Sequence, residues 1–216
     1  MQDTPFIAIE GPIGVGKTSL AQAISQYFHY PILKEIVDEN PFLSKFYEDI
    51  SEWSFQTEMF FLCNRFKQLE DIHKQYLLKH LPVVADYHIL KNLIFAQRTL
   101  SDKQYEKYYK IFEILTEDMP KPNVIIYLQA SLPTLLKRIA LRGREMEQNI
   151  DPTYLEQLSS DYEKAIDLFE KENPSIPIIR LDGDKLDYVN NQADLEKIIQ
   201  QLEHKGVVPL ESTRKI

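Results

Sequence analysis

The chain has 216 residues, which is enough for one well-buried α/β domain and short for two, so we expect a single domain over residues 1–216. Its 25 Lys and Arg against 33 Asp and Glu leave a net charge of −8, which disfavours binding to nucleic acid polymers and anionic membranes. Cys63 is the single cysteine, which excludes an internal disulfide and fits a reducing cytoplasm. The first residues carry no charged leader or apolar signal core, and no run approaches the ~18 apolar residues of a membrane span.

A glycine-rich segment follows the first predicted strand, Phe6–Glu10. It reads Gly11-Pro-Ile-Gly-Val-Gly-Lys-Thr18 and precedes a helical pattern over residues 19–28. The spacing G-x-x-x-x-G-K-[ST] between a strand and a helix is that of a phosphate-binding loop: backbone N–H groups surround a polyphosphate, Lys17 reaches the outer phosphates, and Thr18 ligates Mg²⁺. We therefore expect a nucleoside triphosphate, Mg²⁺ and phosphate contacts from Gly11, Gly14, Gly16, Lys17 and Thr18.

The remaining strand patterns are short, rich in β-branched residues and separated by helical stretches. They cover residues 31–35, 82–86, 123–128 and 176–181. Helical patterns over 53–78 and 103–117 carry many aromatic residues. This alternation is typical of buried parallel strands in a doubly wound sheet. The sequence therefore predicts an α/β fold with a five-stranded parallel sheet flanked by helices.

Three of the predicted strands end in a carboxylate: Glu10, Glu35 and Asp86. In open parallel sheets, ligands sit at the carboxyl ends of the strands. Glu35 and Asp86 are expected in front of the phosphate loop, where Mg²⁺ needs an oxygen ligand beside Thr18 and a hydroxyl acceptor needs a base. The alternative is that such acids only cap the following helices.

A basic helix end covers residues 135–147. Arg138 and Arg142 share one helical face, and Gly143 then breaks the helix so that Arg144 can move independently. Arginines placed in this way suit a closing lid, over about 138–150, that neutralises charge on a transferring phosphoryl group and excludes water. The alternative is a solvated basic helix end favoured by the helix dipole.

These features together resemble the deoxyribonucleoside kinase family, and more closely its bacterial deoxyguanosine kinase branch, over nearly the whole chain. The matching marks are the phosphate loop, Lys34-Glu35-Ile36, the spacing of Tyr47 and Trp53, Ala85-Asp86-Tyr87, and the lid Arg138-x-x-x-Arg142-Gly143-Arg144-x-x-Glu147. The resemblance implies a P-loop kinase fold, a homodimer, and transfer of the γ-phosphate of ATP to the 5′-hydroxyl of a purine deoxyribonucleoside, with deoxyguanosine as the expected acceptor.

The same resemblance implies roles for single residues on the acceptor side. Glu35 matches the general base that takes the proton of the 5′-hydroxyl, and an alcohol needs such a group during attack. Asp86 matches the acid near Mg²⁺. Tyr47 and Glu147 match the pair that holds the 3′-hydroxyl, and Trp53 matches a further substrate contact.

On the donor side, the resemblance implies a phosphate clamp and a base-binding loop. Arg138, Arg142 and Arg144 match the clamp, in which Arg142 and Arg144 join Lys17 as catalytic cations. Asp182 begins a turn that matches, weakly, the loop beside the adenine of ATP.

The chain departs from the family pattern at two places. Many members carry an arginine after the third-strand acid, whereas Tyr87 and His88 stand here, and the sequence assigns no replacement. Glu58 occupies the position of a base-reading glutamine. A carboxylate only accepts hydrogen bonds, and guanine presents two adjacent donors, so we expect Glu58 to select guanine. Arg65, on the same helical face, is expected to hold Glu58 ionised or to contact the O6 side of guanine.

Three other activities remain compatible with parts of the pattern. A deoxyadenosine or deoxycytidine kinase would differ only in base choice. A thymidylate-type monophosphate kinase would need positive charge more than a base at Glu35 and Asp86. A guanine nucleotide switch would need an Asn-Lys-x-Asp segment, and Asp184-Lys-Leu-Asp187 lacks the asparagine.

Overall fold

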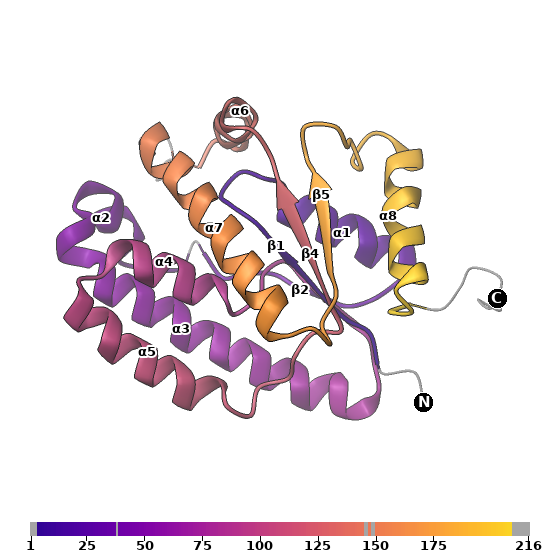
Figure 1. Ribbon diagram of the computed structural model, residues 1–216, viewed down its shortest axis with the longest axis horizontal. Coiled ribbons are helices and arrows are strands. Elements are labelled where there is room, and N and C mark those ends of the chain that lie inside the picture. Colours follow the sequence, from indigo (N-terminus) through magenta and orange to yellow (C-terminus); the bar gives the residue numbers. More distant parts are fainter. Residues whose placement is uncertain (1–3, 38, 145–146, 148–149, 209–216) are drawn as a thin grey trace.

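A computed structural model describes residues 4–37, 39–144, 147 and 150–208 (Figure 1). Its centre is a five-stranded sheet in the order β2-β3-β1-β4-β5, and every strand pairs in parallel with its neighbours. The strands are β1 (Phe6–Glu10), β2 (Ile32–Leu33), β3 (Val83–Ala85), β4 (Val124–Gln129) and β5 (Ile178–Asp182). The predicted five-stranded parallel α/β fold is confirmed.

Helices cover both faces of this sheet. Figure 1 shows α1 and α8 beside each other on one face and α3, α4, α5 and α7 on the other. The helices are α1 (Lys17–Phe28), α2 (Leu43–Glu48), α3 (Ile50–Gln75), α4 (Lys91–Thr99), α5 (Asp102–Thr116), α6 (Leu132–Arg142), α7 (Pro152–Glu172) and α8 (Gln192–His204), with a 3₁₀ turn, η1, at Leu77–Lys79. Among the residues described, no helix is both long enough and apolar enough to cross a membrane.

Burial on two faces explains why β1 is apolar at successive positions. Ile7 and Ile9 pack in the core with α1 and α8, whereas Phe6 and Ala8 contribute to clusters on the opposite face. Neighbouring side chains of a strand point to opposite faces, so a central parallel strand needs apolar residues on both. The sheet is therefore covered on both faces, and the loops that follow β1, β2 and β3 leave it at its carboxyl edge.

Several element boundaries differ from the predicted ones. The predicted strand 31–35 is paired only over β2, because this edge strand has β3 as its single neighbour, and Glu35 lies two residues beyond it. Helix α3 begins at Ile50 instead of 53, since the Asp49 side chain caps it by accepting the N–H of Glu52 at 3.1 Å. It ends at Gln75, and the separate turn η1 covers most of the remainder.

Candidate active site

The phosphate loop lies between β1 and α1, as predicted. Gly11 and Gly14 have φ angles of 148° and 82°, which L-residues rarely adopt. A Cβ on Gly14 would also lie 2.8 Å from the carbonyl oxygen of Leu135, so the loop packs closely on α6. The ammonium of Lys17 donates to the carbonyls of Gly11 and Pro12 at 2.7 and 3.0 Å, and thereby closes the loop on itself.

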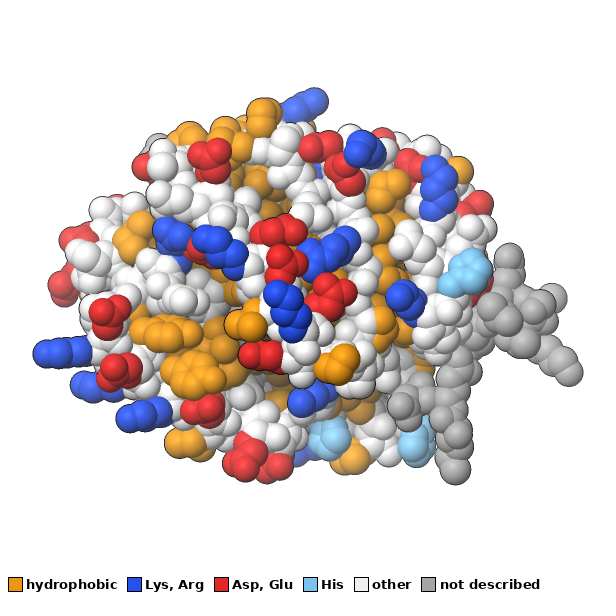
Figure 2. All heavy atoms as spheres, in the orientation of Figure 1, with side chains coloured by type: hydrophobic (Ala, Val, Ile, Leu, Met, Phe, Trp, Pro, Cys, Tyr) orange, Lys and Arg blue, Asp and Glu red, His pale blue; other side chains and the backbone are white. Residues whose placement is uncertain are grey.

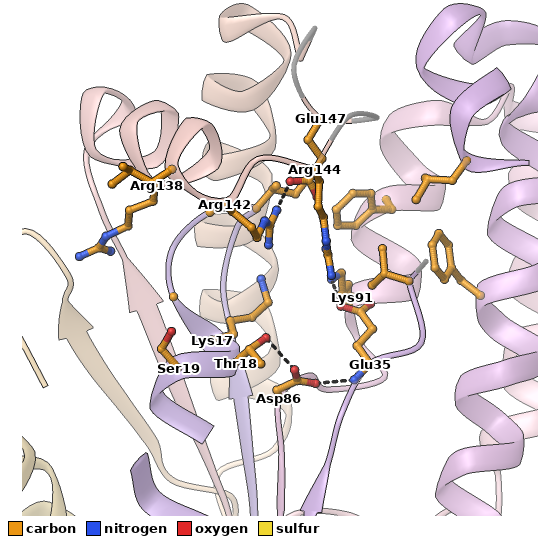
Figure 3. Close-up of a pocket in the computed structure, with 18 of the residues that line it drawn as sticks. Lys17, Thr18, Ser19, Glu35, Asp86, Lys91, Arg138, Arg142, Arg144 and Glu147 are labelled. Atoms are coloured by element: carbon orange, nitrogen blue, oxygen red, sulfur yellow. Dashed lines mark hydrogen bonds and ion pairs between the residues drawn. The ribbon is translucent and has the colours of Figure 1, made fainter. Parts of the chain in front are cut away.

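A cavity of about 620 Å³ opens in front of this loop. Figure 3 shows residues from α1, α4, α6 and the segments after β2 and β3 around the same space. The cavity brings together most of the residues that the sequence predicted for the site. These are Gly14, Gly16, Lys17, Thr18, Glu35, Tyr47, Glu58, Arg65, Asp86, Arg138, Arg142, Arg144 and Glu147.

Asp86 links the phosphate loop to the segment that carries Glu35. Its Oδ2 accepts the hydroxyl of Thr18 at 2.8 Å, and its Oδ1 accepts the backbone N–H of Glu35 at 2.7 Å (Figure 3). Burial raises the pKa of Asp86, and the hydrogen bond from Thr18 opposes that shift. A carboxylate and a hydroxyl thus meet beside the loop, which is an oxygen-only donor set suited to Mg²⁺.

The Glu35 carboxylate is buried between two cations. Its Oε2 accepts the ammonium of Lys91 at 2.8 Å, and its Oε1 accepts the guanidinium of Arg65. Burial by itself would raise the pKa of Glu35, but Lys91, Arg65 and Lys17 outweigh it and hold the pKa below its ordinary value. Glu35 is therefore ionised throughout the physiological pH range.

Glu58 lies deeper in the cavity, with only 2% of its surface exposed. Among the described residues, one oxygen accepts the Thr99 hydroxyl at a long 3.5 Å and the other, Oε2, has no hydrogen-bond partner. Burial raises its pKa to about 8, although Arg65 opposes the shift. The guanidinium of Arg65 pairs with Glu35, so its expected role toward Glu58 or toward the O6 side of guanine stays a prediction.

The arginines of the predicted lid divide into two groups. Arg138 points away from the others in Figure 3, and its guanidinium donates to the carbonyls of Val15 and Gly183 at 2.8 and 2.7 Å, so it braces the phosphate loop against the loop after β5. Arg142 and Arg144 both donate to the carboxylate of Glu147. Residues 145–146 and 148–149 of the predicted lid lie outside the described part of the chain.

Three predicted contacts do not line the cavity. Trp53 stacks on Phe42 with ring centroids 6.0 Å apart, and the ammonium of Lys45 lies 4.3 Å from its ring. Asp182 turns toward the backbone of Asp184 and pairs with Lys185 at 2.7 Å. Gly11 contributes its carbonyl to Lys17 without lining the cavity.

The cavity also contains residues that sequence reasoning missed. One of them is Lys91, which lies five positions after Asp86 at the start of α4. The sequence feature that could have identified it is a lysine that closely follows a strand-terminal acid. Beyond Asp182, the donor end of the cavity is lined by the loop segment from Leu186 to Asn190, in which Tyr188 donates to the carbonyl of Gly16 at 3.2 Å.

Comparison with known proteins identifies the family of the chain. The sequence model of the family described as "Deoxynucleoside kinase" matches residues 7–208. The chain is 59% identical to "Deoxyguanosine kinase" of Bacillus subtilis (strain 168), over 92% of this chain and 96% of the relative, and 32% identical to "Deoxyadenosine/deoxycytidine kinase" of the same strain, over 91% of each. The structure of deoxyadenosine kinase from M. mycoides with bound dATP superposes with a TM-score of 0.78, at 29% identity over 92% of this chain and 99% of that one. The chain therefore belongs to the deoxynucleoside kinase family.

Proposed function

We propose that the protein transfers the γ-phosphate of ATP to the 5′-hydroxyl of deoxyguanosine, giving dGMP and ADP for nucleotide salvage. The observation that carries the proposal is the placement of the ionised Glu35 in the same cavity as the phosphate-loop Lys17. This pairing of a carboxylate with a phosphate cradle suits a hydroxyl acceptor, whereas a monophosphate acceptor would be repelled by Glu35. The 59% identical deoxyguanosine kinase supports the choice of nucleoside.

In the proposed reaction, Glu35 receives a proton. The 5′-oxygen forms a bond to the γ-phosphorus as the bond between that phosphorus and the β-bridging oxygen breaks, and the hydroxyl proton passes to the Glu35 carboxylate. Lys17 would leave the carbonyls of Gly11 and Pro12, to which it donates in this structure, for the β- and γ-phosphates. Arg142 and Arg144 would turn from Glu147 toward the transferring phosphoryl group, where charge develops.

The choice of guanine rests on Glu58. Its carboxyl is buried at the far end of the acceptor half, and its Oε2 has no partner among the described residues. An ionised carboxylate would accept N1–H and the exocyclic amine of guanine together. Since Glu58 has a pKa of about 8, deoxyguanosine binding near pH 7 would release a proton.

Deoxyadenosine is the second candidate, and the raised pKa of Glu58 is the observation that favours it. A protonated carboxyl presents one donor and one acceptor, as a glutamine amide does. That pattern suits the amine and ring nitrogen of adenine. The two candidates therefore differ in whether the nucleoside binds the ionised or the neutral form of one residue.

We assign the sugar contacts to Tyr47 and Glu147. Both line the cavity, and the proximity of Glu147 adds to burial in raising the pKa of the Tyr47 hydroxyl, so the phenol remains a hydrogen-bond donor. A donor and a carboxylate acceptor close together suit a sugar hydroxyl. Holding the 3′-hydroxyl would align the 5′-oxygen for attack.

Mg²⁺ is the cofactor that we propose, held by Thr18 and Asp86. Among the described residues, no group of three His, Cys, Asp or Glu side chains could hold a metal, which fits an ion that takes its other ligands from phosphates and water. When bound, it would neutralise charge on the β- and γ-phosphates.

The protein is proposed to act as a homodimer in a reducing cytoplasm, without a nucleic acid polymer or a membrane as partner. Tyr109 and Ile114 on α5 are 39% and 74% exposed, and hydrophobic side chains gather over α3 and α5 in Figure 2. Lys and Arg are interspersed with Asp and Glu on the same face. Light scattering coupled to size-exclusion chromatography would measure the mass, and a single-chain mass of 25.4 kDa would contradict the dimer.

One assay tests the proposed function. Purified protein with Mg·ATP is given deoxynucleosides and their monophosphates in turn, and ADP release is measured. Turnover with deoxyguanosine above all other acceptors supports the proposal. Preference for deoxyadenosine would favour the second candidate, and turnover with monophosphates alone would contradict both.

A further inference from the structure

Lys91 is a buried cation to which the reaction described so far gives no role. It is the first residue of α4, and its side chain is 9% exposed. Lysine is rarely buried unless it is paired, because an isolated ammonium loses its hydration. Here the ammonium meets one oxygen of Glu35 at 2.8 Å and lies 5.5 Å from the ring centroid of Phe95, at the wall of the cavity (Figure 3).

Neither residue at the place of the family arginine puts a cation into this cavity. The hydroxyl of Tyr87 donates to Gln68 on α3 at 3.0 Å, and its ring packs beneath the guanidinium of Arg65. His88 packs against Phe169, and burial lowers its pKa to about 4, so it is neutral. Of the residues that follow β3 up to the start of α4, Lys91 is therefore the one that brings a cation to the cavity.

Lys91 also lies close to the donor half of the site. It contributes, after burial, to lowering the pKa of Lys17 to about 8, which places the two ammonium groups within electrostatic reach of each other. Glu35 accepts Arg65 on one oxygen and Lys91 on the other. Lys91 and Lys17 line the same cavity, in which the 5′-oxygen and the γ-phosphate would meet.

We propose that Lys91 takes the place of the missing family arginine and acts as a positioning residue, whose hydrogen bond holds the Glu35 carboxylate in the orientation in which it receives the proton of the 5′-hydroxyl. The inference rests on the proposed function, in which Glu35 is the base. Lys91 and Arg65 each hold one oxygen of this buried carboxylate, which fixes its rotation at the wall of the cavity.

Other charged and titratable groups also face Glu35, and they define what Lys91 adds. They are Lys17 from α1, Glu58 and Arg65 from α3, Asp86 and Tyr87 after β3, and Tyr162 from α7. Among the cations, Lys17 is committed to the phosphates during turnover. Arg65 and Lys91 are then the two cations that hydrogen-bond Glu35 among the described residues.

Replacing Lys91 with methionine tests the proposal. We expect kcat with deoxyguanosine to fall by about 10²-fold. The KM values for deoxyguanosine and ATP should change little, because in the proposed reaction Lys91 acts through Glu35 and not on either substrate. Lys91→Arg should restore most of the lost kcat, because its guanidinium can donate to Glu35 again. Lys74→Met, at an exposed lysine of α3 that also pairs with a carboxylate, is the matched control and should match the wild type.

Four outcomes separate the possibilities. An active wild type with an unchanged kcat in Lys91→Met overturns the role of Lys91 and leaves the proposed function intact. An equal loss of kcat in Lys91→Met and Lys91→Arg overturns the role of the hydrogen bond to Glu35. If Lys91→Met lacks the cooperative melt of Lys74→Met, Lys91→Leu replaces it, and a wild-type kcat in that variant overturns the proposal. A wild type that does not phosphorylate deoxyguanosine refutes the proposed function instead.

Discussion

The two halves of the active site are built in different ways. The donor half is a continuous loop whose backbone conformation, with Gly11 and Gly14 at positive φ, forms the phosphate cradle. The acceptor half joins single side chains from separate elements, such as Glu35 after β2, Glu58 in α3 and Lys91 in α4. A backbone cradle binds any polyphosphate, whereas side chains decide which acceptor is bound and activated. Changes in the two halves should therefore have separable effects.

Glu35→Gln should have the largest effect and should affect the acceptor half alone. The amide cannot take the proton of the 5′-hydroxyl, so kcat with deoxyguanosine should fall by about 10³-fold. Affinity for ATP, measured by calorimetry, should stay at the wild-type value. Glu52→Gln, at an exposed residue of α3, is the control. A comparable loss of ATP affinity would mean that the two halves are not separable.

Glu58→Gln should change selectivity more than rate. Loss of a carboxylate that accepts both guanine donors should reduce the preference for deoxyguanosine over deoxyadenosine by about 10- to 100-fold, as expected for one mismatched buried polar contact. The ratio of kcat/KM for the two nucleosides measures it, with Glu52→Gln as control. An unchanged ratio would remove Glu58 from base selection.

Gly14→Ala should damage the donor half. The positive φ and the close approach to α6 together should lower the free energy of unfolding by about 3 kcal/mol and raise the KM for ATP, with the KM for deoxyguanosine little changed. Gly143→Ala is a matched variant, since φ is 67° there but a Cβ would meet no atom within 4 Å. It should cost about 1 kcal/mol. Urea unfolding measures both free energies. Equal decreases in Gly14→Ala and Gly143→Ala would contradict the close packing of the phosphate loop on α6.

The smallest expected effect is a pH dependence of the free energy of unfolding, measured without added substrates. Glu58 has a pKa of about 8 when folded against an ordinary value of 4.5, so the folded state binds a proton that the unfolded state releases. Its contribution to stability is complete below pH 4.5 and is lost as the pH rises through 8. Between pH 6.5 and 8 the free energy of unfolding should fall more steeply in the wild type than in Glu58→Gln. If the free energies of unfolding of the wild type and Glu58→Gln change in parallel with pH, the Glu58 carboxyl lies in a more polar environment than the structure indicates.

Much of the fold followed from local patterns. Short β-branched runs that alternate with helical periodicity predicted the parallel sheet, and the loop glycines with Lys17 and Thr18 predicted the donor half. Both signals lie within short stretches of chain, where periodicity and spacing report the local conformation directly. Element ends were less accurate, because the edge position of β2 and the Asp49 cap of α3 depend on neighbours in space.

By itself, the sequence determined that the chain carries a phosphate loop on a parallel sheet and that Glu35, Glu58 and Asp86 are its candidate acids. Only the tertiary structure decided how these acids are paired. It placed Arg65 on Glu35 instead of Glu58, and it brought Lys91 to the second oxygen of that carboxylate. The physical reason is that an ion pair depends on distance and burial, and residues 35, 65 and 91 become neighbours only when β2, α3 and α4 pack together.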